Sequence, residues 1–188
     1  MTFLTILLAT AAATPQAVHP QDAFFASLSA LCGRAFEGRI VSSPVEADRD
    51  FAGRRLFMHV RDCRQDEIRV PFRVGDDRSR TWVVRRRADR RDVSALSLHH
   101  QHLHADGSED RLSNYGGSAI TDGTETRQEF PVDSDTRHLF ERENIPQSMT
   151  NVWALETVPG TRFAYELRRP GRFFRIEFDL SRPVAPPD

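Results

Sequence analysis

Four of the seven histidines of this 188-residue chain lie close together, at positions 99–104. Imidazole nitrogens are common ligands of zinc and copper, and histidine is well suited to proton transfer near neutral pH. On a β-strand every second side chain faces the same way, so His100, His102 and His104 would share one face and His99 the other. Neighbours on one face lie about 6.5–7 Å apart, so two of them can reach one ion.

A metal site in this stretch would also need a ligand from elsewhere in the chain. The outer two histidines of the row are too far apart for one ion, so a single metal would use two neighbours and a third group. His59 is the first candidate for that group, followed by Asp106 or Glu109 near the turn that comes after the histidines. The alternative is a solvated hairpin with a polar tip. We therefore hold zinc or copper binding as a second hypothesis.

Other common motifs of catalysis and cofactor binding are missing from the sequence. The chain has no Gly-x-Gly-x-x-Gly or Walker sequence and no Gly-x-Ser-x-Gly elbow. The segment 106–110 lacks the residue order of a calcium loop. No histidine follows His138, so a haem bound late in a barrel would have no obvious axial ligand.

Short β-strands would position the histidine stretch. Residues 68–74 alternate apolar and polar side chains, which indicates a half-buried strand. We count about ten such strands with no strand–helix–strand alternation. This predicts a mainly β fold, a single antiparallel up-and-down barrel, because closure removes exposed sheet edges. A helix over 23–32 capped by Asp22, and a short helix over 134–144 capped by Ser134 or Asp135 before the last three strands, complete the prediction.

The opening helix, the long meander and a last strand ending in Phe-Asp-Leu resemble the calycin barrels, the group of lipocalins and fatty-acid-binding proteins. We expect five aromatic side chains to point into the barrel. They would fill a solid core or, if the barrel keeps a cavity, line a site for a small apolar or amphipathic ligand. These residues are Trp82, Trp153, Phe163, Tyr165 and Phe174.

Several segments also resemble a group of short exported bacterial proteins that have no assigned activity. The resemblance implies export and a single domain, and it implies no function. The segments that carry it are LCGRAFEG (31–38), HVRDC (59–63), VGDDRSRTW (74–82), HLHADG (102–107), YGG (115–117) and RQEFP (127–131).

The N-terminal sequence MTFLTILLATAAA is an apolar run followed by small residues, typical of a secretory signal although the usual basic start is missing. It is too short for a stable membrane-spanning helix. We therefore expect a signal peptide and linker over 1–20, one barrel domain over 21–182, a disordered tail over 183–188, and a periplasmic or extracellular protein without a membrane span.

The two cysteines, Cys32 and Cys63, are the whole complement of the chain. An oxidising compartment favours a disulfide between them, with two buried thiols as the alternative. A bridge closing a loop of this size would stabilise the fold by about 3–4 kcal/mol.

Composition is that of a globular domain, with 39% hydrophobic and 28% charged residues and a net charge of -1. The balanced charge predicts no nucleic-acid partner. All 26 basic residues are arginine, and they are concentrated in the segment 54–91, before an acidic segment over 92–143. Our first functional hypothesis is a non-catalytic, ligand-binding barrel. The alternatives are a metal-binding protein or metal-dependent enzyme and, third, an interaction domain for an acidic partner.

Overall fold

Strands dominate the computed structural model, which describes residues 17–87 and 95–186. The strands are β1 (Ala35–Ile40), β2 (Leu56–His59), β3 (Asp62–Cys63), β4 (Glu67–Val74), β5 (Asp77–Arg86), β6 (Leu96–His102), β7 (Tyr115–Ser118), β8 (Arg127–Pro131), β9 (Val152–Val158), β10 (Arg162–Arg169) and β11 (Arg172–Asp179). The helices are α1 (Pro20–Ser29) and α2 (Ser134–Arg142), with short 3-10 turns η1 (Glu46–Phe51) and η2 (Pro146–Ser148).

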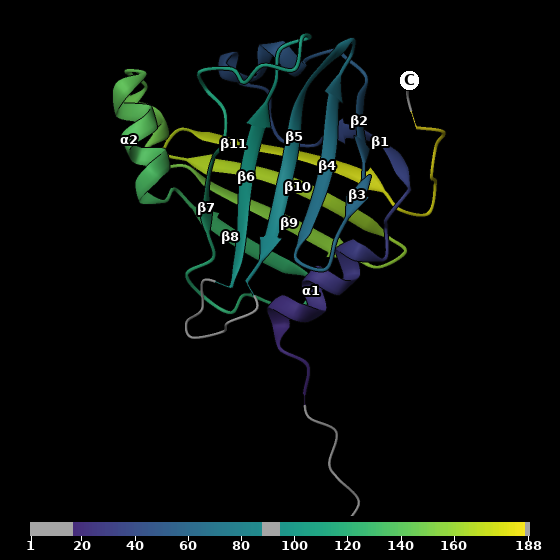
Figure 1. Cartoon of the computed structure of the whole chain (residues 1–188). Helices are drawn as coiled ribbons and strands as arrows, with labels where there is room; N and C mark the ends of the chain where they lie inside the picture. The colour runs from purple at the N-terminus through teal and green to yellow at the C-terminus, as the bar shows by residue number, and fades with distance from the viewer. Residues whose placement is uncertain (1–16, 88–94, 187–188) are drawn as a thin grey trace, which may run out of the picture.

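Ten of these strands pair antiparallel in the order β7-β6-β5-β4-β2-β1-β11-β10-β9-β8, and β3 adds only to β4. The first and last strands of the chain therefore lie side by side. In Figure 1, β4, β5 and β6 stand in front and β9, β10 and β11 run across behind them. The predicted mainly β barrel of about ten strands, with one helix at its start and one before the last strands, is confirmed. The architecture is compatible with that of the calycins.

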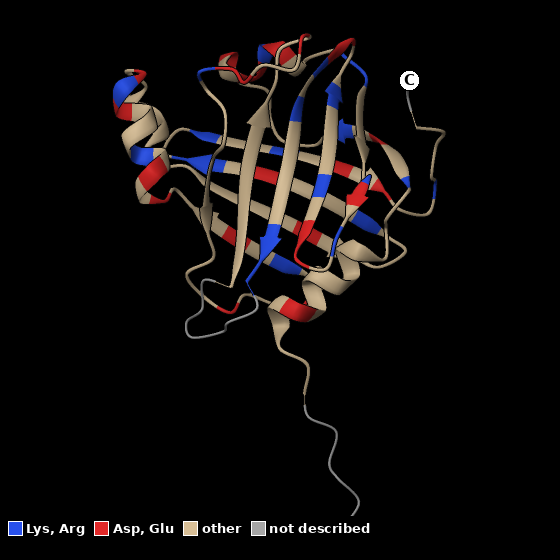
Figure 2. Ribbon diagram, in the orientation of Figure 1, with Lys and Arg blue, Asp and Glu red and all other residues tan. Residues whose placement is uncertain are grey.

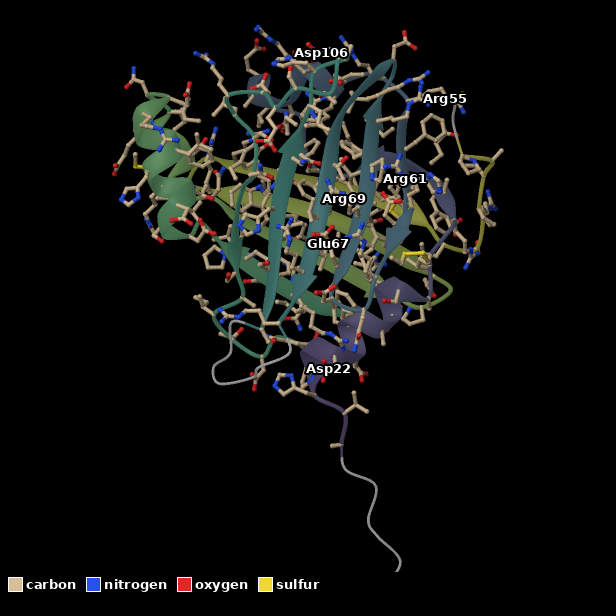
Figure 3. All side chains as sticks on the ribbon, in the orientation of Figure 1. Asp22, Arg55, Arg61, Glu67, Arg69 and Asp106 are labelled. Atoms are coloured by element: carbon tan, nitrogen blue, oxygen red, sulfur yellow. A yellow bond between two sulfur atoms is a disulfide. The ribbon has the colours of Figure 1, made fainter. Side chains whose placement is uncertain are left out.

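The alternation of the sequence sets which side chains face inward. In β4, Ile68, Val70, Phe72 and Val74 are buried, and the residues between them are half-buried on the outside. Figure 3 shows Glu67 and Arg69 on this front strand, where the two side chains form an ion pair at 3.2 Å.

Charged residues occur on strands all around the barrel (Figure 2), and many of them form ion pairs within a strand or between strands. Glu67 also binds Arg85 at 2.8 Å, and Arg55 binds Glu37 at 3.0 Å. On the opposite wall, Arg127 binds Glu166 at 2.5 Å and Arg175 binds Glu177 at 2.8 Å. Much of the predicted basic segment is therefore neutralised by carboxylates of the same chain.

Helix α1 closes one end of the barrel. Phe24 and Leu28 are fully buried in the core, and Asp22 pairs with Arg86 at the end of β5 at 3.2 Å. Figure 3 shows Asp22 at this end and Asp106, in the β6–β7 loop, at the other. The helix begins earlier than predicted because His19, rather than Asp22, caps it, and Pro20 is tolerated in a first turn whose N–H groups have no helical partner.

The cap of helix α2 also differs from the two predicted caps, because the helix is capped by Asp133. The side chain of Asp133 accepts a hydrogen bond from the backbone of Thr136 at 2.9 Å, so neither Ser134 nor Asp135 is the cap. The carboxylate of Asp133 receives a second contact from His99, whose Nε2 lies 3.1 Å away. His99 thus faces outward from β6, as its position between inward-facing neighbours predicts.

The predicted disulfide is confirmed. Cys32 and Cys63 are bonded across a sequence separation of 31 residues. The bridge joins the segment directly after α1 to the short strand β3. It therefore fastens the helix that closes the barrel to the strand wall.

The barrel is nearly closed between β7 and β8. The segment Gly116–Gly117 belongs to β7. The backbone N–H of Asp133, just after β8, donates to the carbonyl oxygen of Gly116 at 3.2 Å. A methyl group on Gly117 would overlap the carbonyl oxygen of Pro131, so glycine lets the two strands approach.

Residues 1–16 of the predicted signal peptide lie outside the described residues. Within the predicted tail, Val184 donates its backbone N–H to the carbonyl oxygen of Ala35 at 2.8 Å. No helix within residues 17–87 and 95–186 is long and apolar enough to cross a membrane.

Candidate ligand cavity

A cavity of about 420 Å³ lies in the half of the barrel away from α1. Strand β5 shows where the cavity lies. Arg80 and Trp82, in the first half and the middle of this strand, line the cavity, whereas Arg86 at its end pairs with Asp22 of α1. The cavity is open to solvent. Its rim includes Phe51 at the end of η1 and Ile145 beside η2.

Aromatic side chains are the largest group in the wall. The ring of Trp82 is stacked on Phe72 at 4.5 Å and on Tyr165 at 4.6 Å, with interplanar angles of 16° and 6°. Trp153 and Phe174 line the cavity from β9 and β11. Rings packed in this way bury a large apolar area, and stacked pairs add stabilisation beyond that burial.

His100 is buried in the middle of this aromatic wall. Its Nδ1 lies 3.2 Å from the carbonyl oxygen of Tyr115, and its Nε2 lies 2.9 Å from the hydroxyl oxygen of Tyr165. Because a carbonyl oxygen only accepts hydrogen bonds, Nδ1 carries the proton and Nε2 accepts from Tyr165. Burial lowers the pKa of His100 to about 3, so the ring is neutral with both nitrogens engaged.

Tyr165 extends this network toward a second wall of the cavity. Burial raises the pKa of its phenol well above the ordinary value, although a hydrogen bond from Trp153 acts in the opposite direction. The hydroxyl of Tyr165 donates a hydrogen bond to Nε2 of His100. The polar atoms of the buried wall satisfy one another, which rigidifies the site and leaves His100 no proton to exchange with a ligand.

His102 and Tyr115 form a second pair nearer the rim, with 3.1 Å between Nε2 and the phenol oxygen. Burial, and then the charge of Arg80, lower the pKa of His102. Burial raises the pKa of Tyr115 to about 12. At neutral pH both groups are therefore uncharged, and the phenol of Tyr115 donates a hydrogen bond to the imidazole of His102.

Two arginines bring positive charge to the rim. Arg80 from β5 pairs with Asp77, and Arg172 from β11 donates from Nε to Asp48 at 2.9 Å. Asp110, in the loop after β6, also lines the cavity, and its carboxylate accepts the backbone N–H of Leu112 at 2.7 Å. The cavity thus combines an aromatic interior with a charged mouth.

The predicted ligand-binding residues fall at different depths in the barrel. Trp82, Trp153, Tyr165 and Phe174 line the cavity. Phe163 also points inward, but it is fully buried, 6.1 Å from the ring of Trp82, and is not among the residues that line the cavity. It supports the cavity from the side of α1.

The four predicted metal ligands are not brought together. His100 and His102 face the cavity from β6, as predicted from their spacing. His104 lies beyond the end of β6 with more than half of its side chain exposed, 3.8 Å from Asp110. His59 sits on the outer side of β2, between the buried positions of that strand.

The predicted third ligands also point elsewhere. Asp106 accepts hydrogen bonds from Ser108, and Glu109 accepts one from Asn114, all within the β6–β7 loop. Among the described residues no group of three or more histidine, cysteine or acidic side chains is placed to hold a metal ion. The geometry therefore does not favour the metal-binding hypothesis.

Arg80, Arg172 and Tyr115 are among the cavity residues that were not singled out from the sequence. Arg80 and Arg172 lie two positions before Trp82 and Phe174, so the same alternation that turned these aromatic residues inward could have identified them. Tyr115 is one residue before the glycine pair, at the start of the short strand β7. Its pairing with His100 across β6 and β7 is what turns its ring inward.

No protein-family model, no curated protein and no solved structure matches this chain. The likeness to calycins is therefore one of architecture alone. The function has to be inferred from the cavity and its chemistry.

Proposed function

We propose that this protein is an exported, non-catalytic barrel that binds a small amphipathic ligand in its open cavity. The observation that carries the proposal is the cavity itself, about 420 Å³ with an aromatic interior and polar groups at the mouth. Pockets of this size and make-up are typical of small-molecule sites.

The buried hydrogen bonds favour binding over catalysis. His100 and Tyr165 are committed to each other and to the surrounding wall. A general acid or base needs an atom that can reach the substrate, and His100 has none to offer. The interior therefore offers a ligand rigid aromatic surface rather than reactive groups.

Export is supported by the disulfide between Cys32 and Cys63, since such bonds persist in oxidising compartments. The apolar N-terminal sequence supports the same conclusion. The ligand would then be a molecule of the periplasm or of the surroundings of the cell.

The two tryptophans of the chain provide a direct test, because both line the cavity. N-phenyl-1-naphthylamine is a small uncharged amphipathic fluorophore that can accept excitation energy from tryptophan. We expect saturable quenching of tryptophan emission with one probe bound per chain. Native mass spectrometry of protein from the periplasm would show whether a ligand co-purifies.

A matched pair of variants identifies the site of binding. Leu167→Phe enlarges a side chain that lines the cavity, whereas Val158→Phe adds the same ring on the outer side of β9. We expect the first substitution to weaken probe binding and the second to leave it unchanged. Equal binding by both variants, or no saturable quenching in the parent protein, would refute the proposal.

A further inference from the structure

Given the ligand-binding function proposed above, we infer that the ligand is an amphipathic organic acid whose carboxylate is held at the cavity mouth by Arg80 and Arg172. Both guanidinium groups line the cavity, and they come from different walls of the barrel, β5 and β11. A planar guanidinium matches a carboxylate in shape and charge.

The carboxylates that pair with these arginines lie outside the lining of the cavity. Asp77 binds Arg80 and Asp48 binds Arg172, and neither aspartate is among the residues that line it. Asp48 is 5% exposed. The two acids therefore orient the guanidinium groups from behind while the cationic faces remain toward the ligand.

Each arginine keeps donors for a ligand. Arg172 uses Nε and Nη2 to bind Asp48 and the carbonyl oxygen of Ala47, and its Nη1 has no partner among the residues described. Arg80 binds Asp77 through Nη1, and its Nε and Nη2 have no partner within the described part of the chain. These N–H groups can bind a carboxylate without breaking either ion pair.

The other ionisable groups of the lining do not cancel this charge. His100 is neutral because burial lowers its pKa to about 3, and burial also lowers the pKa of His102. Among the described residues that line the cavity, Asp110 is the one acid. Its carboxylate accepts the backbone N–H of Leu112 and lies 3.8 Å from His104. Within the lining, two guanidinium groups therefore face one carboxylate that already has partners in its own loop, while Asp77 and Asp48 bind the arginines from outside the lining.

An aromatic pair connects the two arginines. The guanidinium carbon of Arg80 lies 5.7 Å from the ring centre of Phe51, and that of Arg172 lies 5.9 Å from the ring centre of Phe174. The rings of Phe51 and Phe174 are 4.8 Å apart. The apolar part of the acid would extend from this pair toward Trp82 and the stacked wall.

A series of three probes of equal chain length tests the charge preference: octanoate, 1-octanol and octylamine, each titrated into the whole protein at neutral pH and followed by calorimetry and tryptophan emission. We expect octanoate to bind about tenfold more tightly than octanol, the gain typical of a hydrogen bond to a charged group. Octylamine, which is cationic, should bind more weakly than octanol.

Variants assign this preference to the two arginines. Arg80→Gln should bring the Kd of octanoate to that of octanol, whereas Arg85→Gln, on the outer side of the same strand, should keep the preference. Arg172→Gln alone would leave Asp48 buried without its partner, so Arg172 is tested as the double variant Asp48→Asn/Arg172→Gln. We expect the same loss of preference in this variant, with octanol binding retained.

The outcomes separate this inference from the function on which it rests. Equal affinity for octanoate and octanol, or a preference that survives both the Arg80 and the Arg172 variants, would overturn the carboxylate inference and leave the binding function standing. Failure of all three probes and of N-phenyl-1-naphthylamine to bind would overturn the function, and the inference with it.

Discussion

The hydroxyl group of Tyr165 donates a hydrogen bond to Nε2 of His100, 2.9 Å away, inside the barrel wall. The other nitrogen of His100 donates to the carbonyl oxygen of Tyr115, so the ring is held in one tautomer and without charge. A histidine that the fold admits only in its neutral form makes the stability of the fold sensitive to acid.

The first prediction is a loss of stability below pH 6.5. The pKa of His100 falls from its ordinary value of 6.5 to about 3 on folding, because burial disfavours the charged ring. Below pH 6.5 His100 is protonated in the unfolded chain but stays neutral in the native chain. The free energy of unfolding therefore falls as the pH drops toward 3. At pH 5 this single group should cost about 2 kcal/mol relative to pH 7, measured by urea unfolding.

His100→Gln should remove most of this loss between pH 6.5 and pH 5, where carboxylates with lowered pKa values contribute little. His138→Gln, on the exposed side of α2, is the matched control and should behave like the parent protein. His102, whose pKa burial also lowers, would add a smaller effect of the same sign. Parallel pH profiles for the parent and His100→Gln would contradict the buried network.

The second prediction concerns the line where β7 meets β8. A methyl group introduced by Gly117→Ala would overlap the carbonyl oxygen of Pro131, a backbone atom that cannot turn aside. We expect a loss of more than about 2 kcal/mol in the free energy of unfolding and faster amide exchange in β7 and β8.

Gly160→Ala is the control for this substitution. Gly160 has φ of 70° and nothing within 4 Å of an added methyl group, so only backbone strain is introduced. That strain costs about 1 kcal/mol. If Gly117→Ala proved as mild as Gly160→Ala, the close approach of β7 and β8 would have to be wrong.

The third prediction concerns the disulfide. Reduction of the bond between Cys32 and Cys63, or a double Cys→Ser variant, releases a loop of 31 residues in the unfolded state. The loss should be about 3–4 kcal/mol, read from urea unfolding with and without dithiothreitol. Because the bridge lies on the α1 side of the barrel, probe binding in the remaining folded protein should be unchanged. A reduced protein as stable as the oxidised one would show that the bridge does not restrain the chain.

Sequence reasoning predicted the barrel because each strand has one buried face. The four apolar residues of β4, at positions 68, 70, 72 and 74, show this alternation without interruption, and the structure buries all four. The ends of helices were less accurate. His19 caps α1 in place of the predicted Asp22. Asp22 instead binds Arg86 on β5, a contact that the local sequence does not reveal.

The candidate site could be predicted only in part. Alternation places His100 and His102 on one face of their strand. It does not tell whether His59 points to the same side of the sheet, because that depends on which residues of β2 face inward. Nor does it give depth along the barrel, which is why Phe163 lies in the core while Tyr165, two residues on, reaches the cavity. Alternation with Trp82 turns Arg80 inward, but its pairing with Asp77 and its place beside the cavity depend on the folded chain.

The pairing of β1 with β11 has a consequence for how the chain can fold as it is made. Gly38 and Phe178 face each other across these strands although they lie near opposite ends of the sequence. Local hairpins such as β4–β5 and β10–β11 can form early, but the ring cannot be completed until the last strand has been delivered. During synthesis one edge of β1 would remain unpaired, so the nascent chain should depend on chaperones that cover exposed strand edges.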